Sequence, residues 1–286
     1  MQNIRIKIKK YLKEHAPAIF LFLQNTNNFK REVKKIISYN LPIKINFFIT
    51  ILRNKPYFGI NYTANQVWPE RKSIMERLID TEIKNSDDPE FKILEIGTWA
   101  GASAIIWARA CRNNNRGAVF CIDTWKGAKN ILEGDNHEIK RGVKKNRILK
   151  LFLHNIRTSG LENYIFPIMM SSNQAMGIIK PNTFNFIYLD ADHAYDQVLN
   201  DLKNYNKLLK LGGIMCGDDY ELRLSQVDLS NSKEHSEKDF VKDPRAKEYF
   251  HPGITLAIDE VFKEVSMKNG FWAIRKSGNG WAEVAL

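Results

Sequence analysis

Acidic side chains follow two predicted strands at the point where each strand ends. The apolar run at residues 184–189 is a strand pattern that leads directly into Asp190. A later strand pattern, residues 214–217, leads into Asp218 and Asp219. In a doubly wound sheet the carboxyl ends of neighbouring strands line one crevice, so we expect these three carboxylates to converge. Oxygen ligands of this kind suit Mg2+, Mn2+ or Ca2+, which predicts a hard divalent cation at this place.

His193 stands just after Asp190 and offers a group that accepts a proton. An unperturbed histidine pKa of about 6.5 leaves the imidazole mostly neutral at pH 7. An alcohol hydroxyl is almost wholly protonated at that pH, and a divalent cation lowers the pKa of an oxygen that it binds. We therefore expect Asp190 and His193 to be catalytic, the first as a ligand of the cation and the second as general base. Asp192, between them, is a candidate contact for a cofactor or a substrate.

A carboxylate and two glycines mark an earlier strand and the turn after it, within residues 92–103. Glu95 lies among the apolar residues of the strand, and Gly97 and Gly101 bracket the turn. Glycines permit backbone angles closed to other residues, and the helix that follows presents unpaired N–H groups to a ligand. Glu95 would repel a pyrophosphate but can hold an ammonium group or a ribose hydroxyl. The turn therefore predicts a small-molecule site that is not a dinucleotide site.

Asp123 closes the next predicted strand, residues 118–122. Nucleoside-binding α/β folds place an acidic residue there to bind ribose hydroxyls through its two acceptor oxygens. The structural alternative for Asp123 is a turn-forming or helix-capping role.

The pattern Glu-Ile-Gly-Thr-x-x-Gly-x-Ser at residues 95–103 resembles the cofactor motif of class I S-adenosylmethionine-dependent methyltransferases. The resemblance covers about residues 61–286. It implies that Asp123 binds the ribose of S-adenosylmethionine and that the small polar residues after a third strand, residues 164–170, contact the adenine. The candidate cofactor-binding residues are Glu95, Gly97, Gly101, Ser103, Asp123, Ser171, Ser172 and Asp192.

The acidic residues at the strand ends resemble those of metal-dependent O-methyltransferases, a branch that includes macrolide-sugar and other sugar O-methyltransferases. Carried over by position, Asp190, Asp218 and Asp219 would hold Mg2+ or another hard divalent cation. The resemblance implies divalent-metal-assisted methylation of a hydroxyl on a sugar, a glycan or a related polar metabolite.

Two other functions fit the same residues. One is a metal-independent methyltransferase acting on nitrogen, carbon or a carboxylate, in which the aspartates only cap helices and fill turns. The other is a non-catalytic protein that binds a nucleoside. A nicotinamide oxidoreductase is disfavoured, because Glu95 and a single Gly-x-x-x-Gly stand where the Gly-x-Gly-x-x-Gly fingerprint would be.

The elements that must position these residues form an α/β fold. We expect a doubly wound seven-stranded sheet, the Rossmann-like methyltransferase fold, preceded by an amphipathic helix at residues 64–84. A late helix at 254–266 leads into an antiparallel edge hairpin with strands at 271–275 and 281–284. The polar stretch at 221–250 is expected to be a loop that covers the substrate, because long structureless loops are usually functional.

Residues 1–60 are expected to be a basic amphipathic helical arm, and residues 61–286 the methyltransferase domain. Residues 1–55 hold 12 Lys and Arg but only two acidic residues, so almost all of the net charge of +11 lies there. Short basic helices are predicted at 4–15 and 29–38. Such an arm can attach to an anionic membrane surface, or it can pack on the domain as a solvated cap.

Composition limits the class and the compartment of the protein. The hydrophobic content of 44% suffices for a globular core. Apolar runs in the arm are too short to span a bilayer, and no cleavage site of a signal peptide follows them. Three scattered cysteines indicate reduced thiols in a cytoplasmic protein, peripheral to the membrane if the arm binds lipid. The expected partners are a small-molecule or glycan substrate and a second copy of the chain, but not nucleic acid, because no recognised binding module accompanies the charge.

Overall fold

The computed structural model describes residues 41–59, 69–128, 132 and 137–286. The chain divides into two units, one ending at Arg53 and one beginning at Asn54, and each is described by itself. The predicted helices at 4–15 and 29–38 lie outside the described residues. In the first unit the structure describes α4 (Leu41–Leu52). Among the helices of the described residues, none combines the length and the apolar character needed to cross a membrane.

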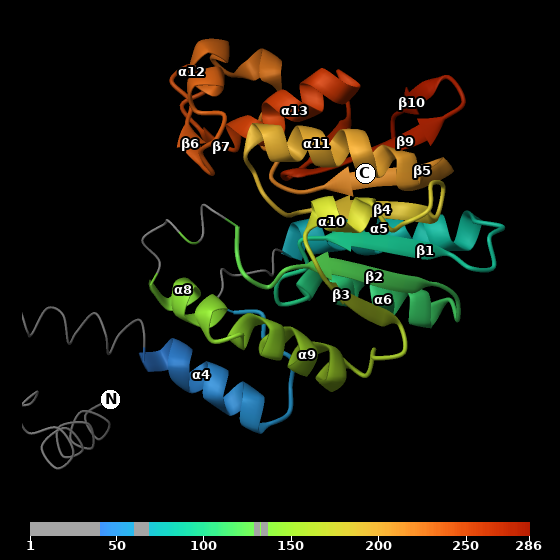
Figure 1. Cartoon of the computed structure of the whole chain (residues 1–286), viewed down its shortest axis with the longest axis vertical. Coiled ribbons are helices and arrows are strands. Elements are labelled where there is room, and N and C mark those ends of the chain that lie inside the picture. The colour runs from blue at the N-terminus through green and yellow to red at the C-terminus, as the bar shows by residue number, and fades with distance from the viewer. Residues whose placement is uncertain (1–40, 60–68, 129–131, 133–136) are drawn as a thin grey trace, which may run out of the picture. The chain divides into compact units, whose positions relative to one another are not determined.

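One large sheet forms the centre of the second unit (Figure 1). Its strands are β1 (Lys92–Ile96), β2 (Ala118–Asp123), β3 (Ile165–Met169), β4 (Phe184–Leu189), β5 (Leu209–Gly217), β8 (Ser266–Lys268), β9 (Phe271–Ser277) and β10 (Gly280–Ala282). The strand order is β3-β2-β1-β4-β5-β9-β10, and β8 also pairs with β9. Strands β1 to β5 run parallel, whereas β9 is antiparallel to β5. The predicted doubly wound α/β fold is confirmed.

The eight strands fill seven positions across the sheet. β9 pairs with β8 through residues 271–273 and with β10 through residues 275–277. Because the other edge of β9 is taken by β5, β8 and β10 lie end to end on the same outer edge. The predicted hairpin of β9 and β10 is confirmed, but the helix expected at 254–266 ends at Phe262, and β8 begins at Ser266. That helix stops earlier because Lys263 adopts a positive φ of 67°, which a helix cannot continue through.

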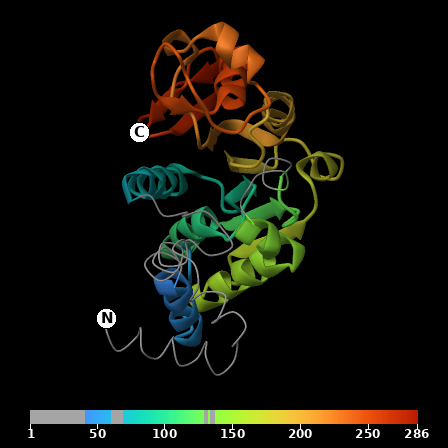
Figure 2. The same cartoon turned by 90° about the vertical axis from the view of Figure 1, so that its left-hand side faces the viewer.

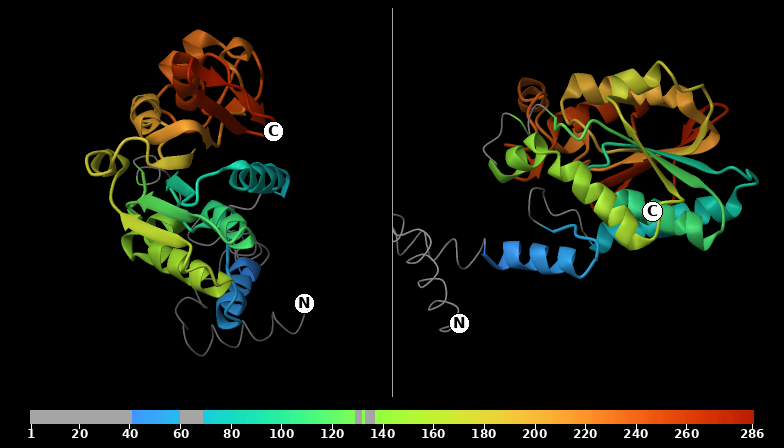
Figure 3. Two further views of the ribbon diagram at one scale, coloured as in Figure 1. Left: turned by 90° about the vertical axis from the view of Figure 1, so that its right-hand side faces the viewer. Right: turned by 60° about the horizontal axis from the view of Figure 1, so that its bottom comes forward.

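Helices cover both faces of the sheet (Figures 2 and 3). They are α5 (Pro69–Asn85), α6 (Ala102–Asn113), α8 (His137–Lys144), α9 (Arg147–Ser159), α10 (Ser172–Met176), α11 (Tyr195–Tyr205), α12 (Leu229–Glu234) and α13 (Pro252–Phe262), with 3-10 turns η2 (Asn206–Leu208) and η3 (Leu224–Gln226). Apolar residues of α5, α6 and α9 form one buried cluster with the sheet. Those of α10, α11 and α13 form the other cluster. The arrangement is the two-sided layering of a doubly wound fold.

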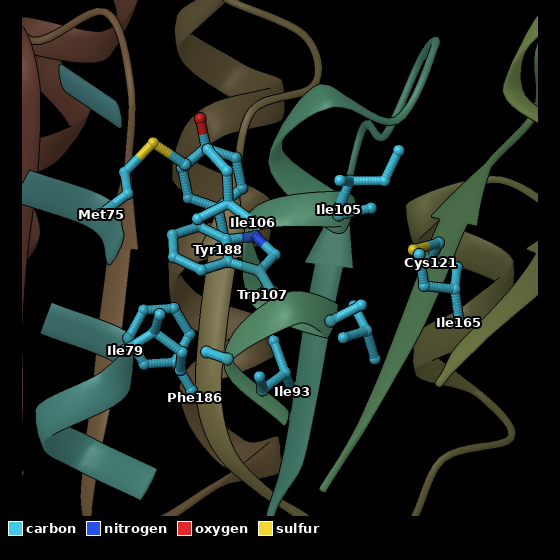
Figure 4. Packing of buried hydrophobic residues seen from close by; sticks show 14 of the residues in the cluster. Met75, Ile79, Ile93, Ile105, Ile106, Trp107, Cys121, Ile165, Phe186 and Tyr188 are labelled. Atoms are coloured by element: carbon cyan, nitrogen blue, oxygen red, sulfur yellow. The ribbon is translucent and has the colours of Figure 1, made fainter. Parts of the chain in front are cut away.

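Trp107 of α6 is one of two buried tryptophans in the first cluster and is fully buried (Figure 4). Its ring centroid lies 5.2 Å from that of Phe186 and 5.3 Å from that of Tyr188, both on β4. Met75 and Ile79 of α5 approach the same region (Figure 4). The three cysteines are buried free thiols in this cluster, as predicted. This packing fixes β4, and with it the position of the residues that follow the strand.

The stretch between β5 and α13 is folded, although a structureless covering loop was expected at 221–250. It contains η3, α12 and a short hairpin of β6 (Val241–Lys242) with β7 (Tyr249–Phe250). Leu222, Val227 and Phe250 form a small apolar cluster of its own. Asp243 is fully buried and accepts hydrogen bonds from the backbone N–H groups of Asp228, Arg245 and Ala246. These contacts hold this insertion in a defined conformation beside the sheet.

Candidate active site

The carboxyl ends of β1 and β4 touch where the strand order reverses. From β1 the chain proceeds to β2 and β3 on one side, and β4 and β5 lie on the other side. The N–H of Asp190 donates to the carbonyl oxygen of Ile96 at 2.9 Å. A Cβ atom added to Gly97 would lie 1.9 Å from the carbonyl oxygen of Asp190, and Gly97 has a φ of +84°. Open α/β sheets bind ligands at such a reversal, so both predicted halves of the site meet there.

Gly101 begins α6 in a left-handed conformation with a φ of +85°. A Cβ atom added there would lie 2.8 Å from the ring of Phe152, which α9 brings over the turn. We expected both glycines to make room for a ligand, whereas the structure fills the space beside each with atoms of the chain itself. What the turn still offers to a ligand is the unpaired N–H groups at the start of α6.

Glu95 is fully buried beneath the turn. The hydroxyl of Ser103 donates to its Oε1 at 2.9 Å, and its Oε2 is buried without a hydrogen-bond partner. Burial raises the pKa of Glu95 to about 8, partly opposed by hydrogen bonds to the carboxylate. The hydrogen bond between Ser103 and Glu95 therefore joins the start of α6 to β1.

Asp123 ties the two loops of this region together. Its carboxylate accepts the backbone N–H of Trp99 at 2.8 Å and that of Trp125 at 2.6 Å. Burial raises the pKa of Asp123, although these N–H groups favour its charged form. Trp125 is itself buried, and its indole N–H donates to the carbonyl oxygen of Trp99. A carboxylate oxygen can accept more than one hydrogen bond, so a ribose hydroxyl can still bind to Asp123.

Three further candidates for cofactor contact hold helix ends in the structure. Ser171 caps α10 in a reciprocal pair of hydrogen bonds with Gln174. The hydroxyl of Ser172 accepts a hydrogen bond of 3.2 Å from Gln197 on α11. Asp192 accepts the N–H of Ala194 at 3.0 Å, just before α11. These bonds place all three at the strand ends, as predicted, and give each of them a local structural role.

Asp190, His193 and Asp219 come together at the ends of β4 and β5. One ligand atom from each lies within 4.8 Å of the other two, and His193 Nε2 is 3.3 Å from Asp219 Oδ2. Burial and the Asp219 carboxylate raise the pKa of Asp190 to about 6. The hydroxyl of Tyr188 donates to Asp190 at 3.2 Å. We refer to Asp190, His193 and Asp219 as the central cluster.

His193 is surrounded by carboxylates. Its Nδ1 lies 2.5 Å from Asp239 Oδ1, while Nε2 faces Asp219. Burial disfavours the charged imidazolium, but Asp239, Asp219 and Asp190 outweigh that effect and raise the pKa of His193 to about 9. These carboxylates favour the protonated imidazole, whereas the sequence led us to expect a mostly neutral base.

Asp218 does not face the central cluster in the way the sequence suggested. Its carboxylate forms an ion pair with Arg71, which α5 contributes, and it also accepts the N–H of Asp219. The side chains of Asp218 and Arg71 are 8% and 20% exposed, so their charges compensate each other largely out of water. Arg71 lies far from Asp218 in sequence, and no local pattern pointed to this pairing.

Three residues of the site were not identified from the sequence: Glu221, Asp239 and His251. His251 Nδ1 lies 2.9 Å from Glu221 Oε1, and His251 Nε2 lies 3.9 Å from Asp239 Oδ1. The rings of His193 and His251 meet edge to face, with centroids 4.7 Å apart. The site therefore contains a pair of histidines, of which the sequence analysis assigned only His193.

The His-Pro-Gly sequence before α13 explains how His251 reaches this position. Pro252 begins the helix, where its missing N–H is not needed. A Cβ atom added to Gly253 would lie 2.2 Å from the carbonyl oxygen of His193 and 2.6 Å from the backbone nitrogen of Tyr195. Only glycine lets the first turn of α13 approach this backbone so closely, and this approach places His251 beside His193. The motif His251-Pro252-Gly253 is visible in the sequence, but the sequence does not show that it packs against His193.

The donor atoms fit a divalent cation. In two further groups the ligand atoms also lie within 4.8 Å of one another. These groups are His193 with Asp239 and His251, and Asp219 with Glu221 and His251. A histidine whose second ring nitrogen is held by a carboxylate is the usual arrangement for a metal ligand. A cavity of about 30 Å3 lies beside Asp190 and His193, between the end of β4 and helices α11 and α13. This volume accommodates a water molecule or a small ion.

Comparison with known proteins gives a match over the part of the chain that carries these strand ends. Residues 94–220 match a family model described as a methyltransferase domain. An uncharacterized protein of Acanthamoeba polyphaga mimivirus is 26% identical over 148 residues, which are 52% of this chain and 58% of that protein. The chain thus spans somewhat more than half the length of this curated relative.

Two solved structures share the fold. The O-methyltransferase NovP aligns with a TM-score of 0.51 and 16% identity, over 73% of this chain and 80% of that one. A proposed caffeoyl-CoA O-methyltransferase from Staphylococcus aureus aligns with a TM-score of 0.50 and 15% identity, over 88% of this chain and 100% of that one. At these identities the likeness establishes the arrangement of the strands and helices.

Proposed function

Residues 94–220 of this chain are a methyltransferase domain, and we propose that the protein is an O-methyltransferase that uses S-adenosylmethionine and a divalent cation. The predicted class of enzyme, a methyltransferase, is confirmed by this match. The acceptor atom, the cation and the substrate class are our proposal. The observation that carries it is the central cluster, which lies next to the Gly97 turn.

S-adenosylmethionine would lie across the carboxyl ends of β1 and β2. The N–H groups at the start of α6 and the carboxylate of Asp123 are the groups that can bind its polar atoms. Ser171, Ser172 and Asp192 stand at the neighbouring strand ends and complete the set that the sequence assigned to the cofactor. Gly97 brings this region against Asp190, so cofactor and acceptor sites share one edge of the sheet.

Asp190, Asp219 and His193 would hold the divalent cation, with two oxygen donors and one nitrogen donor. Such a cation lowers the pKa of a hydroxyl group that it binds, which an alcohol acceptor needs before it can attack a methyl group. Asp218, expected as the third oxygen ligand, is engaged with Arg71 and would instead balance the charge of the site.

A ring nitrogen cannot bind a cation and accept a proton at the same time, so His193 is the group placed to remove the acceptor proton only while Nε2 is deprotonated and not bound to the cation. Asp239 holds the Nδ1 side of the ring, so Nε2 is the atom that faces the rest of the central cluster. A ring nitrogen fixed in this way keeps the other nitrogen aligned for proton transfer. His251 packs against the same ring and limits its rotation.

The acceptor that this environment suits is a polar, hydroxylated molecule. The insertion brings Glu221 and Asp239 to the open side of the site, next to His193 and His251. Carboxylates and imidazoles bind several neighbouring hydroxyls through hydrogen bonds, whereas they disfavour an apolar acceptor. A sugar or glycan hydroxyl therefore fits best, in agreement with the resemblance to sugar O-methyltransferases.

A metal-independent methyltransferase is the second candidate. The ion pair of Arg71 with Asp218 and the contacts of His193 with Asp219 and Asp239 balance much of the negative charge without a metal. In that case His193 alone would accept the proton from the acceptor.

The experiment that tests the proposal follows formation of S-adenosylhomocysteine from S-adenosylmethionine with a panel of hexosides and other small alcohols. We expect turnover that needs Mg2+ or Mn2+ and stops with excess chelator. Turnover that persists in chelator would favour the metal-independent candidate. Turnover with amine or carboxylate acceptors, and none with alcohols, would contradict O-methylation.

A further inference from the structure

Helices α8 and α9 carry a concentration of positive charge that the proposed reaction does not use. Between residues 139 and 161 the chain has seven lysine and arginine residues and no aspartate or glutamate. This is unusual for the second unit, because the chain after residue 55 carries 31 basic and 30 acidic residues. Glu138, at the start of α8, and Glu162, after α9, are the acidic residues that border this stretch, so cations outnumber acidic groups along both helices.

One face of α9 presents these charges to solvent. Lys150 and Arg157 are exposed, and between them Leu153 is 42% exposed. These positions are three and four residues apart, so they form one stripe along the helix. Phe152 and Asn155 belong to the opposite face and are fully buried. An apolar side chain flanked by cations is typical of helices that lie on lipid surfaces.

The end of α8 continues the same charge. Arg141, Lys144 and Lys145 are exposed, whereas Val143 is buried and joins the core cluster. α8 and α9 lie well away from the C-terminal helices α12 and α13 (Figure 2). We call the exposed side chains of Arg141, Lys144, Lys145, Lys150, Leu153 and Arg157 the basic surface.

The basic N-terminal segment enters the second unit at α9. Tyr57 donates its N–H to Asn155 Oδ1 at 2.8 Å, and Asn155 Nδ2 donates back to the carbonyl oxygen of Tyr57 at 2.9 Å. His154 Nε2 lies 2.9 Å from the carbonyl oxygen of Lys55. Lys55 and Tyr57, at the start of the second unit, are therefore held by the helix that carries the basic surface.

α4, in the first unit, has an exposed apolar stripe of its own. Ile45, Phe48, Ile49 and Leu52 are between 40% and 68% exposed. Their spacing of three, four and seven residues places them on one face of the helix. A helix of 12 residues cannot span a bilayer, but such a face can lie in the interface between lipid and water.

We propose that the basic surface binds the surface of a membrane rich in anionic lipids. Phosphate headgroups complement its five cations, and the acyl boundary accommodates Leu153. The stripe of α4, considered by itself, is a second apolar face of the kind that lies in this boundary. Nucleic acid fits less well, because the described residues of α8 and α9 expose no aromatic side chain on which a base can stack.

The basic surface lies close to the cofactor turn. The buried face of α9 presents Phe152 to Gly101, and a helix is roughly 10 Å across. Lipid bound to the outer face of α9 would thus lie about one helix diameter from the turn that begins α6. The inference does not depend on the proposed reaction, because it concerns charge and exposure outside the central cluster.

Sedimentation of the full chain with vesicles tests the inference. We compare vesicles of phosphatidylcholine alone with vesicles that also contain phosphatidylglycerol. Binding is expected only to the anionic vesicles and should weaken with added salt. The triple variant Lys144→Glu, Lys150→Glu, Arg157→Glu should bind at least tenfold more weakly, since each cation near the lipid contributes roughly fivefold.

A matched triple variant, Lys180→Glu, Lys233→Glu, Lys268→Glu, makes the same charge change at exposed positions elsewhere in the second unit. It should retain most of the vesicle binding, and circular dichroism should show both variants folded. Equal binding by the two variants would overturn the role of the basic surface. Equal binding to both kinds of vesicle, or binding to duplex DNA without binding to vesicles, would overturn the choice of an anionic membrane.

Leu153→Ser separates insertion from charge. If the apolar side chain enters the lipid boundary, this variant should bind anionic vesicles several-fold more weakly at a salt concentration at which the wild type still binds. Unchanged binding by Leu153→Ser would overturn insertion of α9.

Discussion

At the scale of single residues, the charged groups of the site compensate one another in pairs. Arg71 balances Asp218, Asp239 lies against His193, and Glu221 lies against His251. Asp190 and Asp219 are then the carboxylates that a cation can bind together with His193. In the proposed metal site, this pairing, more than the number of carboxylates, would decide which residues bind the cation.

This pairing predicts different results for two adjacent aspartates. Asp219→Asn should weaken the binding of Mn2+ at least tenfold, because it removes one of two carboxylate ligands. Asp218→Asn should leave Mn2+ binding largely intact but destabilise the fold by about 3 kcal/mol, because Arg71 then lacks its buried partner. Titration calorimetry with Mn2+ and urea unfolding measure the two effects. Loss of Mn2+ binding in Asp218→Asn would mean that Asp218 is itself a ligand.

Asp201 gives a prediction on stability and pH. It lies on α11, is 5% exposed, and accepts a hydrogen bond of 2.9 Å from Gln197. Burial raises the pKa of Asp201 from 3.8 to about 6. Because the folded pKa is the higher one, the stability that this group contributes is present below about pH 4 and is lost as the pH rises through about 6.

Asp201→Asn removes this dependence while keeping an acceptor for Gln197. The variant should exceed the wild type in free energy of unfolding by about 2 kcal/mol at pH 8, and the two should be nearly equal close to pH 4. Urea unfolding at both pH values checks this. A difference that is the same at both pH values would mean that ionisation of Asp201 is not its cause.

Among single residues, those that stand directly after strands could be predicted from the sequence. Asp123, Asp190 and Asp219 could be placed, because parallel strands bring their carboxyl ends to one edge. His251 and Asp239 could not be placed, because their contacts with His193 join elements that are distant in sequence. The acidic surroundings of His193 could not be predicted for the same reason, since Asp239 is one of the groups that raise its pKa.

At the scale of elements, the site depends on close contact between backbones. The turn after β1 lies against the end of β4 at Gly97, and the first turn of α13 lies against residues 193–195 at Gly253. Each glycine lets two elements meet without a side chain between them. The insertion between β5 and α13 adds Asp239 from a third direction.

The contact at Gly97 can be tested against a glycine with the same backbone conformation. Gly97 has a φ of +84° and Gly212 a φ of +80°, but only Gly97 has atoms within reach of an added Cβ. Gly97→Ala should lower the free energy of unfolding by at least about 2 kcal/mol more than Gly212→Ala, because it adds a clash with Asp190 to the same backbone strain. Equal costs in urea unfolding would mean that the ends of β1 and β4 separate easily.

The order of strands and helices was predictable, and the irregular elements were not. Apolar runs and glycine turns marked β1, β2 and β4, which are buried and regular. β5 begins earlier than expected, at Leu209, because it continues through Gly212 and Gly213. The polar composition of 221–250 concealed α12 and the hairpin of β6 and β7, whose stability rests on a few apolar residues and on the buried Asp243.

At the scale of the whole molecule, the second unit separates three tasks. The ends of β1 and β2 carry the residues assigned to the cofactor, the ends of β4 and β5 carry the central cluster, and the outer faces of α8 and α9 carry the basic surface. The methyltransferase domain match spans the first two regions and includes α8 and α9. At the start of this unit, Lys55 and Tyr57 are hydrogen-bonded to α9.

The most direct test of the account is titration of the full chain with S-adenosylhomocysteine, the product of the methyl donor. We predict binding in the micromolar range for the wild type, and at least tenfold weaker binding for Asp123→Ala, which lacks the carboxylate for the ribose hydroxyls. Asp88→Ala serves as the matched control, because Asp88 accepts the N–H of Glu90 at the opposite end of the sheet. No binding by the folded wild type, or equal binding by Asp123→Ala, would contradict the assignment of the cofactor site.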